Sequence, residues 1–210
     1  MEEITSFREY LRQGKLNESP VALSGHAPFE SLEGESKSKS AMKESFEEFG
    51  KINDMTVFNY KKEDKLIKVA KLYWDDLLNE ERWAIIAELS FKSEKIKSSN
   101  KLIDTKIAMR INTINVREAN RRDKIASKLY GLLLNKNFVV VVSDGTQYEG
   151  AVELWKSFTK IPDINVYIWN EKEDKIISKM TAKTHDNAIW SNGNLGDYSK
   201  MSTKLILTLK

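Results

Sequence analysis

Two arginines, Arg121 and Arg122, stand at the start of a stretch whose apolar residues recur at helical spacing. The first N–H groups of a helix have no partner within the helix, and the helix dipole makes that end positive. A diphosphate placed there would gain several hydrogen bonds and two guanidinium groups. The same residues could instead form a basic, solvated helix start that binds no ligand.

A second group of polar residues follows the continuous β-branched run at residues 138–142. Ser143 and Asp144 come directly after this run, where ligands collect in open α/β sheets if the strand is parallel and buried. Thr146 and Glu149 have the spacing of a capping box, so we favour a helix-capping role for both. Asp144 could also do no more than complete a turn with the next residue.

Three segments before these polar groups alternate between apolar and polar residues, which predicts strands at residues 66–74, 83–91 and 106–116. A polar connection joins the first two, as in a hairpin. Three consecutive strands with short connections predict an antiparallel meander.

The pattern then changes to helical spacing over residues 122–136, followed by the buried strand at 138–142. A second helix is predicted near 151–158 and another strand at 164–169. A strand, a helix and a parallel strand form a right-handed crossover. Residues 171–200 are polar and rich in turn residues, and a last strand is predicted at residues 205–209.

The first fifty residues have little apolar content with which to form a core. Residues 1–13 have the spacing of an amphipathic helix, residues 13–40 read as a loop or extended arm, and residues 41–49 as a short helix. We therefore predict an N-terminal helical and loop appendage at 1–50, which docks on the main domain at 51–210 or on a partner protein.

The order of elements resembles the GCN5-related N-acetyltransferase (GNAT) superfamily. That family marks its cofactor loop with Arg/Gln-x-x-Gly-x-Gly/Ala, and Arg121, Lys124 and Ala126 stand at the matching positions. The second helix, with Leu154 and Trp155, is similar to the family's Leu-Tyr segment. More narrowly, the series Ser-Asp-x-Thr-Gln, a Gly, a Trp and then Val-Tyr-x-Trp, over residues 143–169, is similar to small GNAT-like bacteriophage proteins. The resemblance implies an α+β fold with a mixed sheet, in which the meander leads into a β-α-β-α-β core.

The resemblance also implies a function: transfer of an acetyl group from acetyl-CoA, the co-substrate, to an amine or protein acceptor. The acid for the leaving thiolate would be Tyr148, the general base Asp144 or Glu88, and a backbone N–H near residues 115–117 would hold the oxyanion. The residues that it implies for cofactor binding are Val116, Arg121, Arg122, Lys124, Ile125, Ala126 and Ser143.

One departure from the family pattern concerns the cofactor loop. Lys124 replaces a glycine that would let the backbone approach the phosphates closely. A rival hypothesis is therefore a catalytically silent GNAT-shaped protein that acts through interactions, such as a structural component of a phage. A nucleic-acid-binding protein is a third hypothesis, but the basic residues are interspersed with acidic ones rather than clustered.

Composition narrows the function classes further. The chain has no cysteine, which excludes disulfides, a thiolate nucleophile and zinc sites with Cys ligands. Its two histidines, His26 and His185, are far apart in sequence, so no metal site is predicted. The N-terminus lacks the apolar core of a signal peptide, and no apolar run is long enough to span a bilayer. We expect a cytoplasmic protein, in the host cytoplasm if a phage encodes it, with a homodimer left open.

Overall fold

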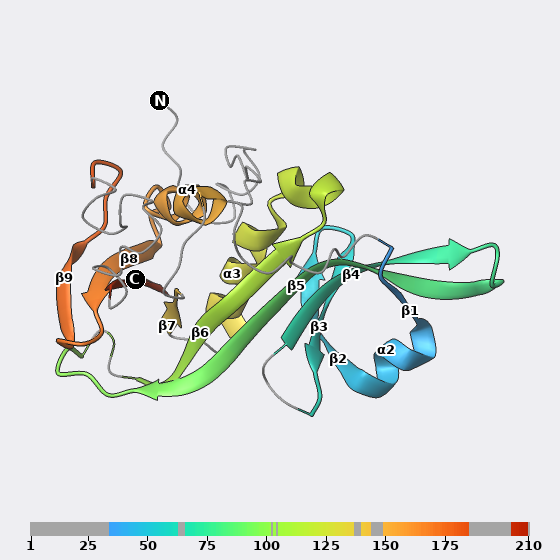
Figure 1. The fold of residues 1–210 in the computed structure, drawn as a ribbon, viewed down its shortest axis with the longest axis horizontal. Coiled ribbons are helices and arrows are strands. Elements are labelled where there is room, and N and C mark those ends of the chain that lie inside the picture. The colour runs from blue at the N-terminus through green and yellow to red at the C-terminus, as the bar shows by residue number, and fades with distance from the viewer. Residues whose placement is uncertain are drawn as a thin grey trace, which may run out of the picture.

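The protein is built on one mixed sheet of ten strands (Figure 1). Nine of them follow the order β2-β3-β4-β5-β6-β7-β10-β8-β9, and β1 pairs with β5. Neighbouring strands are antiparallel, except for β6 and β7, which are parallel. The structure is a computed structural model and describes residues 34–62, 66–101, 103, 105–136, 140–143, 149–184 and 203–209.

The strands range from short pairing segments to β5, which has 17 residues. Their bounds are β1 Ser36–Ser38, β2 Phe46–Ile52, β3 Met55–Tyr60, β4 Leu66–Asp75, β5 Glu80–Ile96, β6 Thr105–Val116, β7 Val140–Val142, β8 Ile164–Asn170, β9 Lys175–Lys179 and β10 Thr203–Leu209. The described helices are α2 Lys39–Ser45, the 3-10 helix η1 Glu118–Asp123, α3 Ile125–Lys136 and α4 Glu149–Phe158.

The three strands predicted from alternation are present as β4, β5 and β6, and they pair antiparallel in sequence order. The helical spacing after them corresponds to α3, and the β-branched run contains β7. β7 pairs parallel with β6, as a strand-helix-strand crossover requires. The last strand, β10, lies between β7 and β8 and pairs with both.

The largest core lies on one face of the sheet, which curls so that α3 contacts β2 as well as β6 and β7. α3 contributes the fully buried side chains of Ile125, Leu129 and Leu133. β2 and α3 come close together at Gly50 of β2, where an added Cβ would lie 3.0 Å from Leu132 Cδ2. Glycine at this position therefore lets β2 come up against the helix.

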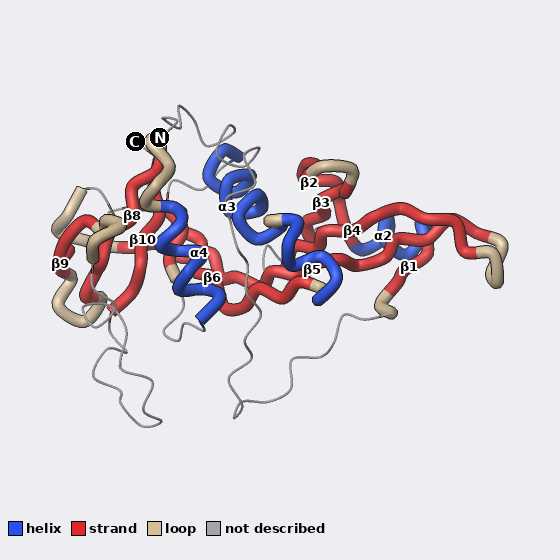
Figure 2. Tube along the Cα trace, turned by 90° about the horizontal axis from the view of Figure 1, so that it is seen from above, coloured by secondary structure: helices blue, strands red, loops and turns tan. Residues whose placement is uncertain are grey.

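α4 packs beside α3 through a cluster of aromatic rings. Trp155 meets Tyr130 edge to face, with ring centroids 5.9 Å apart, and meets Phe158 at 6.0 Å. Both helices lie over the middle of the sheet, between β9 at one end and the β4–β5 hairpin at the other (Figure 2). Aromatic packing between the helices thus closes the main core on the side away from the strands.

Part of the predicted N-terminal appendage belongs to the sheet. β1 lies along β5 with Ser36 opposite Ala84, and it takes the place beside β5 that β6 leaves after Val116. β2 runs through the predicted boundary at residue 50 and pairs with β3. Residues 1–33 lie outside the described part of the chain, so the predicted helix at 1–13 and most of the arm are not described.

The predicted fold class, an α+β GNAT-like arrangement, is wrong. Strands make up 54% of the structure and helices 21%, with three α-helices among the described residues and one ten-stranded sheet. Four strands were not predicted: β1, β2, β3 and β9. β2 and β9 form the two ends of the main strand order, where both faces carry polar residues and apolar alternation is weak.

Candidate functional site

The two parallel strands at the centre of the sheet, β6 and β7, differ in described length. Their pairing begins at Ala108 with Val140 and stops at Arg110 with Val142. β6 continues to Val116, so its last six residues have no strand beside them on the β7 side among the described residues. In this stretch β6 pairs only with β5. The structure therefore has a strand edge that faces the end of β7.

Ser143, directly after β7, bonds to Leu205 on β10. Its N–H donates to the carbonyl of Leu205 at 2.9 Å, and its Oγ accepts from the Leu205 N–H at 2.9 Å. Both bonds lead to β10, on the side opposite β6. Ser143 is buried, and this residue, which the resemblance assigns to cofactor binding, extends the bonding of β7 with β10 by one residue.

α3 begins directly after an unusual backbone conformation at Lys124. This residue has φ 58° and ψ 32°, the left-handed region that glycine enters without strain. Its side chain is only 6% exposed. The backbone conformation at this position is therefore one that glycine favours, while the side chain present is a buried lysine. Ile125 and Ala126, the next two predicted cofactor residues, are also buried and belong to the main core.

Two arginines lie beside the end of β6. Arg121, in η1, donates from Nε to the Val116 carbonyl at 3.3 Å, so this carbonyl points away from β5. The Arg117 N–H donates to the Ile86 carbonyl, which removes it as an oxyanion donor and leaves Val116 as the residue of 115–117 whose backbone faces the strand edge. The buried Arg117 Nε has no hydrogen-bond partner in the described part of the chain.

A buried lysine forms a charged cluster on β4 and β5. Lys68 Nζ lies 2.6 Å from Glu35 Oε1 and 2.7 Å from Glu88 Oε2, and the Lys68 side chain is 7% exposed. Glu88 sits between Lys68 and Asn115 in the cross-strand register. Arg117 Nη2 donates to the Glu35 carbonyl at 2.6 Å and connects the cluster to the end of β6.

The position of Glu88 limits it as a general base. Its neighbours Ala87 and Leu89 face the main core with α3, so the alternation of the strand turns Glu88 to the opposite face. The carboxylate is already paired with a buried ammonium group.

The lysine cluster makes stability depend on pH. Burial lowers the pKa of Lys68, but hydrogen bonds and charge from Glu35 and Glu88 outweigh it and raise the pKa above its ordinary value of 10.5. The stabilisation is thus complete below pH 10.5 and is lost as the pH rises through the folded-state value. We expect the difference in unfolding free energy between wild type and Lys68→Met to shrink above pH 10.5, measured by urea unfolding. A difference that grows with pH would contradict this.

The structure brings together only part of the predicted site. Val116, Arg121 and the start of α3 lie at one end of β6, with Glu88 on the neighbouring strand. Asp144 and Tyr148 lie outside the described residues. Arg122 is in η1, and its side chain is not described.

Sequence reasoning missed three residues of this region: Glu35, Lys68 and Arg117. A lysine within the apolar alternation of β4 was the one available signal, because a buried lysine requires an anionic partner. The partners themselves come from residues 33 and 20 positions away, which alternation does not predict. Arg117 directly follows a strand but has no motif of its own.

Two further features are absent from the described residues: a metal site and a helix that could span a membrane. No group of three or more His, Asp or Glu side chains that could hold a metal ion occurs among the described residues. No helix in that part of the chain has both the length and the apolar content needed to cross a bilayer.

Comparison with protein-family models, with curated proteins and with solved structures gave no match to this chain. The resemblance to the GNAT superfamily therefore stays a prediction from the residues at the start of α3 and in α4.

Proposed function

We propose that the protein binds acetyl-CoA at the end of β6 and transfers the acetyl group to an amine. The observation that carries this proposal is the stretch of β6 that continues for six residues beyond its last pair with β7 among the described residues. A strand edge offers backbone N–H and C=O groups to an extended ligand. The pantetheine arm of CoA is such a ligand, because it is narrow and carries two amides.

The polar groups at this edge suit the rest of the ligand. The start of α3 supplies the positive end of a twelve-residue helix to the diphosphate, with Arg121 close to it. Arg117 Nε is a buried donor that has no acceptor among the described residues. A carbonyl or phosphate oxygen of the ligand would accept its hydrogen bond. These groups lie around Val116, where the backbone faces the edge.

The reaction requires few steps from the protein. The amine nitrogen forms a bond to the acetyl carbonyl carbon, the C–S bond breaks, and the thiolate leaves and takes up a proton while the amine loses one. The Val116 N–H faces the edge and could donate to the oxyanion that develops. Glu88 lies on the opposite face, paired with Lys68, so in this scheme solvent water takes up the amine's proton.

Binding of acetyl-CoA is the direct test, measured by isothermal titration calorimetry. We expect wild type to bind, and Lys124→Gly to bind about tenfold more tightly, because a closer backbone approach would add roughly one hydrogen bond to a charged group, ~1.5 kcal/mol. Lys124→Ala is the matched control. It removes the same side chain but keeps a Cβ in the left-handed conformation, so its affinity should stay nearer to wild type.

If neither wild type nor Lys124→Gly shows a heat of binding at millimolar acetyl-CoA, the proposal is wrong. The second candidate function, a protein that acts by contact without catalysis, would then stand alone. Two observations favour that candidate: the Lys124 side chain is buried at the start of α3, and the Glu88 carboxylate is paired with Lys68.

A further inference from the structure

The tip of the β4–β5 hairpin carries most of the large apolar side chains that the described structure exposes. Leu77 is 96% exposed, Leu78 58% and Trp74 55%, with Tyr73 beside them. The hairpin extends past α2 and β2 and ends one side of the molecule in both Figure 1 and Figure 2. Exposed apolar residues gathered at one projecting point mark an interaction site more often than a solvated turn.

The turn at the tip is held in one conformation. Asp75 Oδ1 accepts from the N–H groups of Leu77 and Leu78 at 3.1 and 3.2 Å, and Asn79 takes the left-handed conformation that closes the turn. The Arg82 guanidinium lies against both Asp75 and Glu80. The two leucines are therefore presented in fixed positions, which lowers the entropy lost when a partner binds them.

Charge restricts the partner. Residues 74–81 include four carboxylates and no basic side chain. Glu80 is paired with Arg82 and Glu81 with Lys39, whereas Asp76 has no ion-pair partner among the described residues. An anionic membrane surface would repel this tip, and a partner with an apolar depression and a basic rim would attract it.

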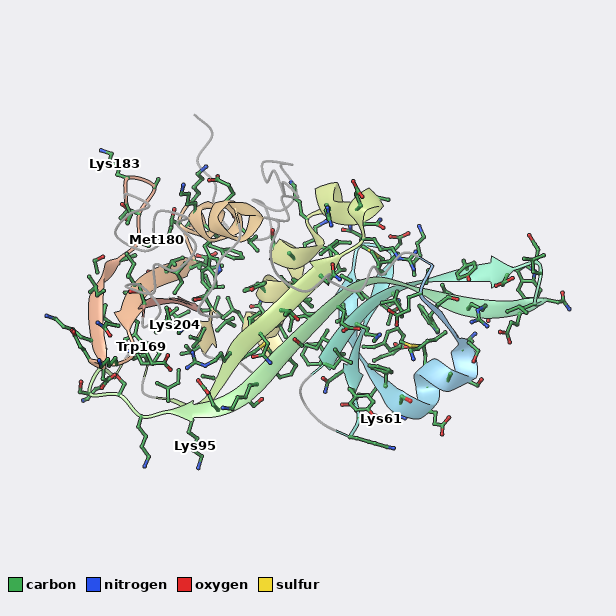
Figure 3. The ribbon with its side chains drawn as sticks, in the orientation of Figure 1. Lys61, Lys95, Trp169, Met180, Lys183 and Lys204 are labelled. Atoms are coloured by element: carbon green, nitrogen blue, oxygen red, sulfur yellow. The ribbon has the colours of Figure 1, made fainter. Side chains whose placement is uncertain are left out.

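Such a depression exists at the opposite end of the same chain. A cavity of about 140 Å³ opens where the loop after α4 meets β8 and the end of β9, with apolar walls from Ile161, Pro162, Val166 and Met180. A cavity of about 150 Å³ can hold benzene, so this one has room for the isobutyl group of a leucine, with Thr159, Lys160 and Lys179 as the polar part of its lining. Met180 lies at the end of the molecule away from the hairpin (Figure 3).

The rim of the cavity is basic. Lys160 and Lys179 line it, both are exposed, and neither has an ion-pair partner in the described residues. Lys183 follows three residues after Met180 on the same end (Figure 3). Asp163 is an exposed carboxylate between two of the lining residues, so two lining lysines stand against one neighbouring acid among the described residues. The rim thus complements the tip in charge as well as in polarity.

We propose that a second copy of this chain is the partner: the hairpin tip of one molecule inserts Leu77 into the cavity of the next, with Asp76 facing Lys160 and Lys179. The two surfaces are different and lie at opposite ends, so the contact is heterologous and leads to a ring or an open chain. One small cavity and a hairpin tip bury less area than a standard stable interface, so association is weak and depends on concentration.

The test is sedimentation velocity of the full chain from about 10 μM to about 1 mM, the range in which small interfaces associate. Wild type should show a sedimentation coefficient that rises with concentration and falls back in high salt. Leu77→Asp, in the tip, and the double variant Lys160→Glu/Lys179→Glu, at the cavity, should each weaken association at least tenfold. All three positions are exposed, so folding is unaffected, as matched urea curves would verify.

Two controls keep the comparison specific. Leu77→Met retains an apolar side chain and should associate as wild type does. Lys51→Glu/Lys62→Glu makes the same change in net charge at exposed positions on the other half of the sheet, and it should also leave association unchanged.

Mixing the two disabled variants gives the decisive measurement. Leu77→Asp keeps an intact cavity and the double lysine variant keeps an intact tip, so the mixture should form a one-to-one dimer that grows no further. A wild type that stays monomeric at every concentration overturns the proposal, whether or not its tip binds lipid vesicles. So do variants that associate like wild type, or a mixture that remains monomeric.

Discussion

Trp155→Ala is expected to lower the free energy of unfolding by about 3–5 kcal/mol, the range for truncating a large buried aromatic side chain. Trp155 is 1% exposed and meets Tyr130 and Phe158 edge to face. Its removal leaves a cavity between α3 and α4 and also removes both ring contacts, each worth roughly 1 kcal/mol. Urea unfolding followed by far-UV circular dichroism measures the change.

Trp74→Ala is the matched control, since the same side chain is removed from an exposed position at the hairpin tip. We expect a change within about 0.5 kcal/mol, as for other surface substitutions. Comparing the stability losses of the two variants, both at micromolar concentration, shows whether burial or the residue type decides the loss. Equal losses of stability, or a Trp155→Ala protein as stable as wild type, would mean that the packing of α4 on α3 is not what holds the main core together.

The double variant Glu35→Gln/Glu88→Gln is expected to lower the unfolding free energy by about 3 kcal/mol or more, because it leaves the buried Lys68 ammonium without an anion. Each single variant leaves one carboxylate within 2.7 Å of Lys68 Nζ, so each alone should be mild. The loss in the double variant should therefore exceed the sum of the two single losses. A double-mutant cycle by urea unfolding at neutral pH measures the coupling.

A surface pair provides the comparison for this cluster. Lys71 and Asp54 form an ion pair at 2.7 Å, but both side chains are more than half exposed. Asp54→Asn should therefore leave stability nearly unchanged. Additive losses at Glu35 and Glu88, or a loss at Asp54 of the same size, would show that Lys68 retains water and that its burial does not decide the energetics.

The elements that carry strong apolar periodicity were predictable from sequence. The alternation of β4, β5 and β6 and the helical spacing at Ile125, Leu129 and Leu133 reflect side chains that the structure buries. The edge strands were not predictable, because charged and exposed residues, Glu47, Glu48 and Lys51 in β2, interrupt the apolar alternation. A prediction that rests on the strongly periodic segments therefore omits four strands and overstates the share of helix.

The start of α3 was predictable from helical spacing, but the contacts around it were not. The start of α3 falls within the predicted helix start, yet the left-handed backbone of Lys124 is a conformation that a lysine seldom adopts. The contact of Lys68 with Glu88 depends on register, and the pairing of β4 with β5 shifts between Val69 and Ala70. Apolar alternation does not reveal such a bulge, and a shift of one residue turns a side chain to the other face.

The attachment of β1 bears on the order in which the chain folds. Ser36 bonds Arg82 across 46 positions, and Glu35 reaches Lys68 across 33 and Arg117 across 82. These partners stand in place only after β4, β5 and β6 have paired, and closing such long loops is slow. We therefore expect β1 to dock late, and contacts made late slow unfolding more than they speed folding. The free energy with which β1 holds to the assembled sheet is therefore expected to set the unfolding rate, and with it the lifetime of the native state.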